Sequence, residues 1–104
     1  MPAFSVRCIF LWPRREGQAL RNLYEERITL WTTSSIETAI QLAEAEAAEY
    51  ASEGEKFLGL CQAYTLPEQP SSSGIEVFSL LRESDLEPRE YLKSFFNTGN
   101  EKTQ

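Results

Sequence analysis

The sequence of 104 residues is long enough for one domain with one hydrophobic core, and its 41% of hydrophobic side chains argues against disorder as the main state. The formal net charge of −6 disfavours general binding to nucleic acid or to an anionic membrane surface. Because histidine is absent, the Ser-His-Asp triad, the Cys-His pair and the HExxH zinc site are all excluded. We therefore expect no bound metal or cofactor.

The start of the chain predicts neither a targeting segment nor a membrane span. Arg7 interrupts the first apolar stretch and Pro13 ends it, so this stretch is too short for either purpose. Cys8 and Cys61 stand singly in apolar runs without a CxxC spacing, which is typical of small buried side chains in a reducing compartment. We therefore expect a cytoplasmic protein.

Residues 3–12 are predicted to form the first strand, because apolar and polar side chains alternate there with a period of two. Residues 24–33 repeat this chemistry after a polar connection at residues 13–23, so the two strands should form a hairpin. A register that places Cys8 near Ile28 keeps the apolar side chains of both strands on one face.

The clearest helix signal lies at residues 35–52. Ser34 precedes Glu37 by three residues, which is the spacing of a capping box, and Gly54 is a natural helix stop. The apolar positions are mostly alanine, so the helix should lie close to the sheet. Its acidic face is either an ordinary solvated surface or a docking face for a basic protein, and it carries Glu37, Glu44, Glu46 and Glu49.

The second half of the chain predicts two more strands and a second helix. Residues 56–66 and 75–83 have strand chemistry, and the Pro- and Ser-rich residues 67–74 predict a hairpin loop between them. A second helix should follow the fourth strand, with a frayed tail at residues 100–104.

These elements predict one α+β domain that spans residues 1–104, with the order ββαββα. Short connections within each pair of strands favour a four-stranded antiparallel sheet. We expect both helices to cover the same face of this sheet.

A charged cluster in the second strand is the strongest candidate for a binding site. Because successive strand residues point to opposite faces, Glu25 and Arg27 share one face and Glu26 lies on the other. In the expected register Glu26 lies beside Phe10 on the apolar side and needs a partner such as Arg82, either as a structural ion pair or as part of a site. Catalysis would require a pocket lined by Glu26, Tyr64 and Arg82.

The predicted sheet has more apolar surface than two short helices can cover. Its third and fourth strands carry apolar side chains on both faces, and large exposed apolar patches usually mark interfaces. We therefore expect a non-enzymatic interaction domain that forms a homodimer through the uncovered face. Two alternatives stay open, namely an acidic immunity-type protein that neutralises a basic toxin and a small enzyme that uses Glu26 with Arg27.

A resemblance to a known family rests on short stretches that together span most of the chain: RCIF, YEERITLW, SSIETAIQLAEAEAAEY, FLGLCQAYTL, EVFSLLRES and YLKSFFNTG. The order of these stretches along the chain, together with the EER and FxTG-like motifs, makes the resemblance specific. On these residues the chain resembles the uncharacterised bacterial domain-of-unknown-function family 4288. The resemblance implies a bacterial cytoplasmic protein in which ββαββα is one unit, and it implies no activity, cofactor or catalytic residue.

Overall fold

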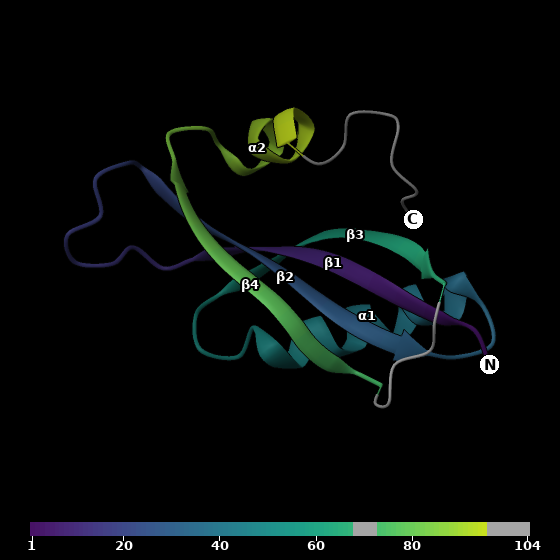
Figure 1. Cartoon of the computed structure of the whole chain (residues 1–104). Helices are drawn as coiled ribbons and strands as arrows, with labels where there is room; N and C mark the ends of the chain where they lie inside the picture. The colour runs from purple at the N-terminus through teal and green to yellow at the C-terminus, as the bar shows by residue number, and fades with distance from the viewer. Residues whose placement is uncertain (68–72, 96–104) are drawn as a thin grey trace.

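The computed structural model describes residues 1–67 and 73–95, which form one four-stranded sheet and two helices (Figure 1). The α+β class and the order ββαββα are confirmed. The predicted tail at residues 100–104 lies outside the described residues. The elements are β1 (Ala3–Trp12), β2 (Asn22–Thr32), α1 (Ile36–Tyr50), β3 (Lys56–Leu66), β4 (Ile75–Ser84) and α2 (Pro88–Phe95).

The strands lie in the order β3-β1-β2-β4, and each neighbouring pair is antiparallel. β1 lies inside the sheet and is covered on both faces, since the successive residues Cys8, Ile9 and Phe10 are at most 4% exposed. β1 and β2 form the predicted hairpin. The prediction that residues 67–74 close a second hairpin is wrong, because β3 pairs with β1 and β4 pairs with β2, at opposite edges.

The register of the hairpin differs by one residue from the expected one. Cys8 lies opposite Arg27, and Phe10 lies opposite Glu25. Because the side-chain period of a strand is two, this shift moves Glu25 and Arg27 onto the apolar face of β1 and moves Glu26 off it. The expected position of Glu26 beside Phe10 is therefore wrong. The observed register is tolerated because α1 and β4 supply polar partners for both buried side chains.

Helix α1 packs on the face of the sheet that carries the even-numbered side chains of β1. Its N-cap is Ser35, one residue after the predicted Ser34, and the Ser35 Oγ accepts a hydrogen bond of 3.1 Å from the Thr38 N–H. The helix residues turned to the sheet are small or slender, and each is at most 1% exposed: Ala39, Ile40, Ala43 and Ala47. As predicted, they bring the helix close to the core residues Phe4, Val6, Cys8, Phe10, Cys61 and Ala63.

Helix α2 lies on the opposite face of the sheet from α1 (Figure 1). The expectation that both helices cover one face is therefore wrong. The physical reason lies in β1, where Phe10 belongs to the core under α1 while its neighbour Ile9 packs with Tyr24 and Tyr91 under α2. Two apolar faces of one central strand require one helix each. Neither described helix is both long and apolar enough to cross a membrane.

Candidate functional site

The structure distributes the predicted site residues over the two faces of the sheet. Glu25 and Arg27 lie on the α1 face, opposite Phe10 and Cys8 of β1. Glu26, Tyr64 and Arg82 lie on the α2 face, because their cross-strand partners all point to that side. Glu26 and Arg27 therefore point to opposite faces of the sheet, and the alternative of a small enzyme that uses these two residues together stays a prediction.

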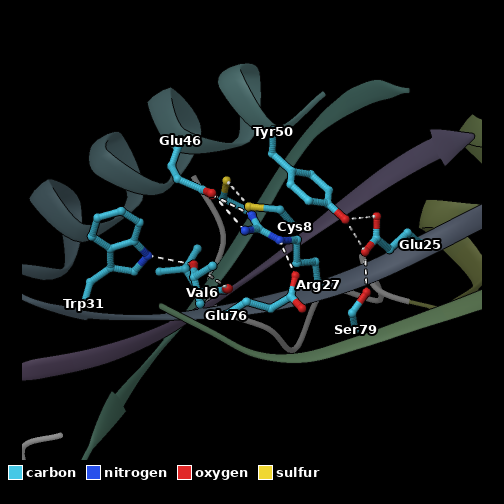
Figure 2. A network of polar contacts seen from close by, with 11 residues as sticks. Val6, Cys8, Glu25, Arg27, Trp31, Glu46, Tyr50, Glu76 and Ser79 are labelled. Atoms are coloured by element: carbon cyan, nitrogen blue, oxygen red, sulfur yellow. Dashed lines mark hydrogen bonds and ion pairs between the residues drawn. The ribbon is translucent and has the colours of Figure 1, made fainter. Parts of the chain in front are cut away.

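Glu25 is 2% exposed, and its carboxylate accepts hydrogen bonds from three different elements. The Tyr50 hydroxyl of α1 donates to it, 2.7 Å from Oε2 and 2.9 Å from Oε1, and the Ser79 hydroxyl of β4 donates to Oε2 (Figure 2). The Trp12 Nε1 of β1 lies 2.9 Å from Oε1. The pKa of Tyr50 is raised by burial and also by its hydrogen bond to Glu25. Glu25 thus joins α1, β1 and β4 around one buried charge.

Arg27 lies beside this network and bridges α1 to β4. Its Nη1 and Nη2 lie 2.5 and 2.9 Å from the two carboxylate oxygens of Glu46, and its Nε lies 2.6 Å from Glu76 (Figure 2). Its guanidinium carbon also lies 3.8 Å from the centre of the Tyr50 ring. Burial lowers the pKa of Arg27, but the hydrogen bonds and charges of Glu46 and Glu76 outweigh it, so the net shift is upward. The guanidinium is thus engaged within the chain.

The two cysteines form a further contact on the α1 face. Cys8 and Cys61 are direct partners across β1 and β3, and their sulfur atoms lie 3.2 Å apart. Both side chains are buried, as the sequence predicted. The pKa of the Cys8 thiol is raised by the hydrogen bond to Cys61 and then by burial. Sequence reasoning missed this pairing because the two residues stand in separate apolar runs.

A polar cluster around Arg7 lies on the α2 face. The Arg7 Nη1 lies 3.3 Å from the Glu26 Oε2, and its Nε lies 2.9 Å from the Gln62 Oε1. The Tyr64 hydroxyl lies 3.4 Å from the Arg7 Nη2. The ion pair partner of Glu26 is therefore Arg7 rather than the expected Arg82. Glu26 and Tyr64 are brought together through Arg7, whereas Arg82 belongs to a neighbouring contact.

Arg82 contacts helix α2 through a pair of stacked tyrosines. The rings of Tyr24 and Tyr91 lie 3.8 Å apart at an angle of 11°, and the Arg82 Nη1 lies 3.2 Å from the Tyr91 hydroxyl. The Tyr24 hydroxyl donates a hydrogen bond of 2.6 Å to the Leu86 carbonyl. Burial raises the pKa of Tyr24 to about 12, and it raises the pKa of Tyr91 against the opposing effect of Arg82. These contacts anchor α2 on the sheet.

One of the four residues of the predicted acidic face of α1 is half-buried and bound within the chain. Glu46 turns toward the sheet and binds Arg27, so its charge is paired within the chain although the side chain is 28% exposed. Glu37 and Glu49 are exposed, and Glu44 is half-buried. The remaining acidic surface is thus smaller than the sequence suggested.

The loop between β1 and β2 borders a surface hollow of about 290 Å³, lined in part by Arg15 and Glu83. The Glu83 carboxylate accepts hydrogen bonds of 2.9 Å from the backbone N–H groups of Ala19 and Leu20. Backbone donors that would attract an external anion are therefore bound to a carboxylate of the same chain. The Glu83 carboxylate therefore holds the loop between β1 and β2 against β4.

Exposed apolar side chains gather on β4, the strand at one edge of the sheet. We name this the β4 surface, and its five side chains are between 38% and 49% exposed: Ile75, Val77, Phe78, Leu80 and Leu81. Leu81 shares the α1 face with Glu25, whereas Phe78 and Leu80 share the α2 face with Ile28 and Glu26. The apolar surplus that the sequence predicted is thus concentrated on one edge strand and reaches both faces.

The polar networks are complete within the described part of the chain. Every buried side-chain nitrogen or oxygen atom there has a hydrogen-bond partner, and no group of three His, Cys, Asp or Glu residues is placed to hold a metal ion. Sequence reasoning missed Trp12, Tyr50, Ser79 and Glu76 as partners of the charged cluster. The correct hairpin register would have revealed that Glu25 and Arg27 face α1 and need such partners.

Comparisons of this chain with protein-family models, with curated proteins and with solved structures give no match. The resemblance to the domain-of-unknown-function family 4288 therefore stays a prediction. The contacts described above are the basis for any functional proposal.

Proposed function

We propose that this chain is a non-enzymatic interaction domain that forms a homodimer through the β4 surface. The observation that carries the proposal is the exposure of five large apolar side chains along one edge strand. In monomeric proteins such edges are usually shortened, charged or covered, because an exposed apolar edge strand pairs readily with another chain.

The β4 strand has the properties of a strand that accepts a partner. It is 10 residues long, and among the described strands it pairs only with β2. It contains no proline, and residues 77–81 carry no charge. The outer backbone edge can therefore bind an added strand, while the side chains on both faces supply apolar contact. This differs from the expected interface, which was a whole uncovered face of the sheet.

A second copy of the chain fits this edge by symmetry and by the lack of charge at the centre of the strand. Antiparallel pairing of β4 with β4 is twofold symmetric, so one edge serves both partners and the assembly closes. With Ser79 on the twofold axis, Phe78 of one copy lies across from Leu80 of the other. The Glu76 end of each strand then lies near the Arg82 end of its partner. The uncharged residues 77–81 of both copies thus form the centre of the pairing.

The polar groups of the chain support an interaction role more than a catalytic one. The carboxylate of Glu25 and the guanidinium of Arg27 are bound by neighbouring side chains, which leaves them structural rather than available to a substrate. The charged pair Arg7 and Glu26 is likewise engaged on the α2 face.

Light scattering coupled to size-exclusion chromatography, over a series of micromolar concentrations, tests the proposal. The expected mass is twice that of the 11.9 kDa chain. Leu80→Lys should give a monomer, since a charge on each copy would be buried at the pairing edge. Leu42→Lys is the matched control, because Leu42 is 42% exposed on α1 and Leu80 is 39% exposed on β4. A monomeric wild type, or equal effects of both changes, contradicts the proposal.

Hydrogen exchange distinguishes strand pairing from other ways of covering the β4 surface. If the interface is a β4–β4 ladder, backbone amides of β4 gain protection as the concentration rises, and those of the opposite edge strand β3 do not. A dimer that leaves β4 exchange unchanged would refute edge pairing. A monomeric wild type whose β4 amides stay unprotected at all concentrations would contradict the homodimer and would leave β4 open to a different partner.

A further inference from the structure

Cys8 and Cys61 are buried directly beside each other in the core under α1. They are Cα partners across β1 and β3, and their sulfur atoms are 3.2 Å apart. Cα atoms of directly opposed residues in antiparallel strands lie about 4.5 or 5.5 Å apart, depending on the position in the ladder. Both values fall within the range of about 4.4–6.8 Å that a disulfide spans. The backbone therefore already has the separation that a disulfide requires.

We propose that Cys8 and Cys61 are an oxidation site, at which hydrogen peroxide converts the two thiols into one intramolecular disulfide within the native fold. This inference is independent of the proposed dimer, because the cysteines lie under α1 and not on β4. It assigns chemistry to two side chains that the interaction role does not use.

The reaction balances with one molecule of peroxide for each pair of thiols. The thiolate of one cysteine attacks a peroxide oxygen, the O–O bond breaks, and the products are a sulfenic acid and, after protonation, one water. The second thiol attacks the sulfenic sulfur, the S–S bond forms, and the hydroxyl leaves as a second water with the remaining thiol proton. Two thiols lose two electrons, and peroxide gains them.

The neighbouring thiol makes the disulfide the favoured product of this site. A sulfenic acid at either position is formed beside the other sulfur, so its capture needs no diffusion and no second protein molecule. Burial and the raised pKa of Cys8 keep the thiolate fraction low, so the first step should be slow and should accelerate at alkaline pH.

The position of the pair determines what the disulfide would do. Cys61 belongs to the edge strand β3, whose ladder with β1 is interrupted between Cys8 and Phe10. Gly59 in this region has a φ of 84°, a left-handed conformation that suits glycine. A disulfide beside this irregularity would tie the edge strand to the central strand. Oxidation should therefore stabilise β3 against local opening.

The test treats the folded protein with hydrogen peroxide, blocks the remaining thiols in denaturant, and measures intact mass and unreduced tryptic peptides. The expected product is a monomer lighter by two hydrogens, in which residues 8–14 are linked to residues 57–82. Its melting temperature should exceed that of the reduced protein by about 5 °C or more, and dithiothreitol should reverse the change.

Cys8→Ala and Cys61→Ala are the matched controls, since each keeps one buried thiol without its partner. Neither variant should lose two hydrogens within one chain, and its remaining thiol should stay reduced or be oxidised to sulfinic acid. The proposal is overturned if the folded wild type gives two sulfinic acids, if its disulfide links two chains, or if linkage appears only after denaturation. Circular dichroism of each protein before oxidation verifies that the starting material is folded.

Discussion

The Arg27 guanidinium binds both carboxylate oxygens of Glu46, and this contact connects the second strand of the sheet to helix α1. The Arg27 side chain is only 9% exposed, whereas those of its partners Glu46 and Glu76 are 28% and 40% exposed. Loss of the contact between Arg27 and Glu46 should therefore destabilise the fold more than loss of the contact between Arg27 and Glu76.

Arg27→Met should lower the free energy of unfolding by about 2–4 kcal/mol, because it leaves the Glu46 carboxylate near the core without its partner. Glu76→Gln should cost less than about 1 kcal/mol, since Glu76 is much more exposed. Urea denaturation of the variants measures both. Adding Glu46→Leu to Arg27→Met should restore part of the loss, and a further loss instead would contradict this account of the pair.

Tyr50→Phe should destabilise the fold by about 1–3 kcal/mol, because it removes a donor from the buried carboxylate of Glu25. Tyr64→Phe is the matched control: its hydroxyl lies 3.4 Å from Arg7 on a side chain that is 42% exposed, so the change should be within about 0.5 kcal/mol of neutral. Equal effects in urea denaturation would show that the Glu25 network does not carry the stability inferred from it.

Tyr91→Ala should release helix α2 from the sheet and cost about 3–5 kcal/mol, since Tyr91 is 1% exposed and stacks on Tyr24. Hydrogen exchange should show lost protection in α2 and retained protection in α1, because the two helices lie on different faces. Tyr91→Phe keeps the stacked ring and removes the hydroxyl that contacts Arg82, so its cost should be about 0.5–1.5 kcal/mol. Loss of α1 protection in Tyr91→Ala would show that the two faces unfold together.

Stability should decline at alkaline pH as tyrosines ionise. The folded pKa of Tyr24 is about 12 against an ordinary value of 10, so the folded state holds this proton more tightly than the unfolded state. The contribution is fully present below pH 10 and is lost as the pH rises through 12. The pKa values of Tyr50 and Tyr91 are also raised, which reinforces the decline.

Melting temperatures measured by circular dichroism across this pH range check the alkaline decline. Tyr24→Phe should be less stable at neutral pH, because the hydrogen bond to Leu86 is lost, but its melting temperature should fall less steeply with pH. A slope as steep as that of the wild type would mean that Tyr24 is not among the groups responsible.

Sequence reasoning located the six elements because their signals are local. Alternation with a period of two marks the strands, and alanines at helical spacing mark α1. The register of the hairpin was beyond this reasoning, because apolar content alone favoured Cys8 opposite Ile28. The observed partner of Cys8 is Arg27, which is possible only because Glu46 and Glu76 arrive from elements distant in the sequence.

The candidate site shows the same division. The residues Glu25, Glu26, Arg27, Tyr64 and Arg82 were identifiable from their types, yet their partners depended on strand order. The expected hairpin would have made β3 and β4 neighbours, whereas the observed order places them at opposite edges of the sheet and leaves apolar residues of β4 exposed. The adjacency of Cys8 and Cys61 likewise depends on the pairing of β3 with β1.

The sequence by itself determined the α+β class, the order ββαββα and the surplus of apolar strand surface, since each depends on residues close together in the chain. Only the tertiary structure decided which strands are neighbours, which face each helix covers and which charges meet in the interior. The reason is that a shift of one residue, or an exchange of two strands, leaves local preferences unchanged while it reassigns every contact across the sheet.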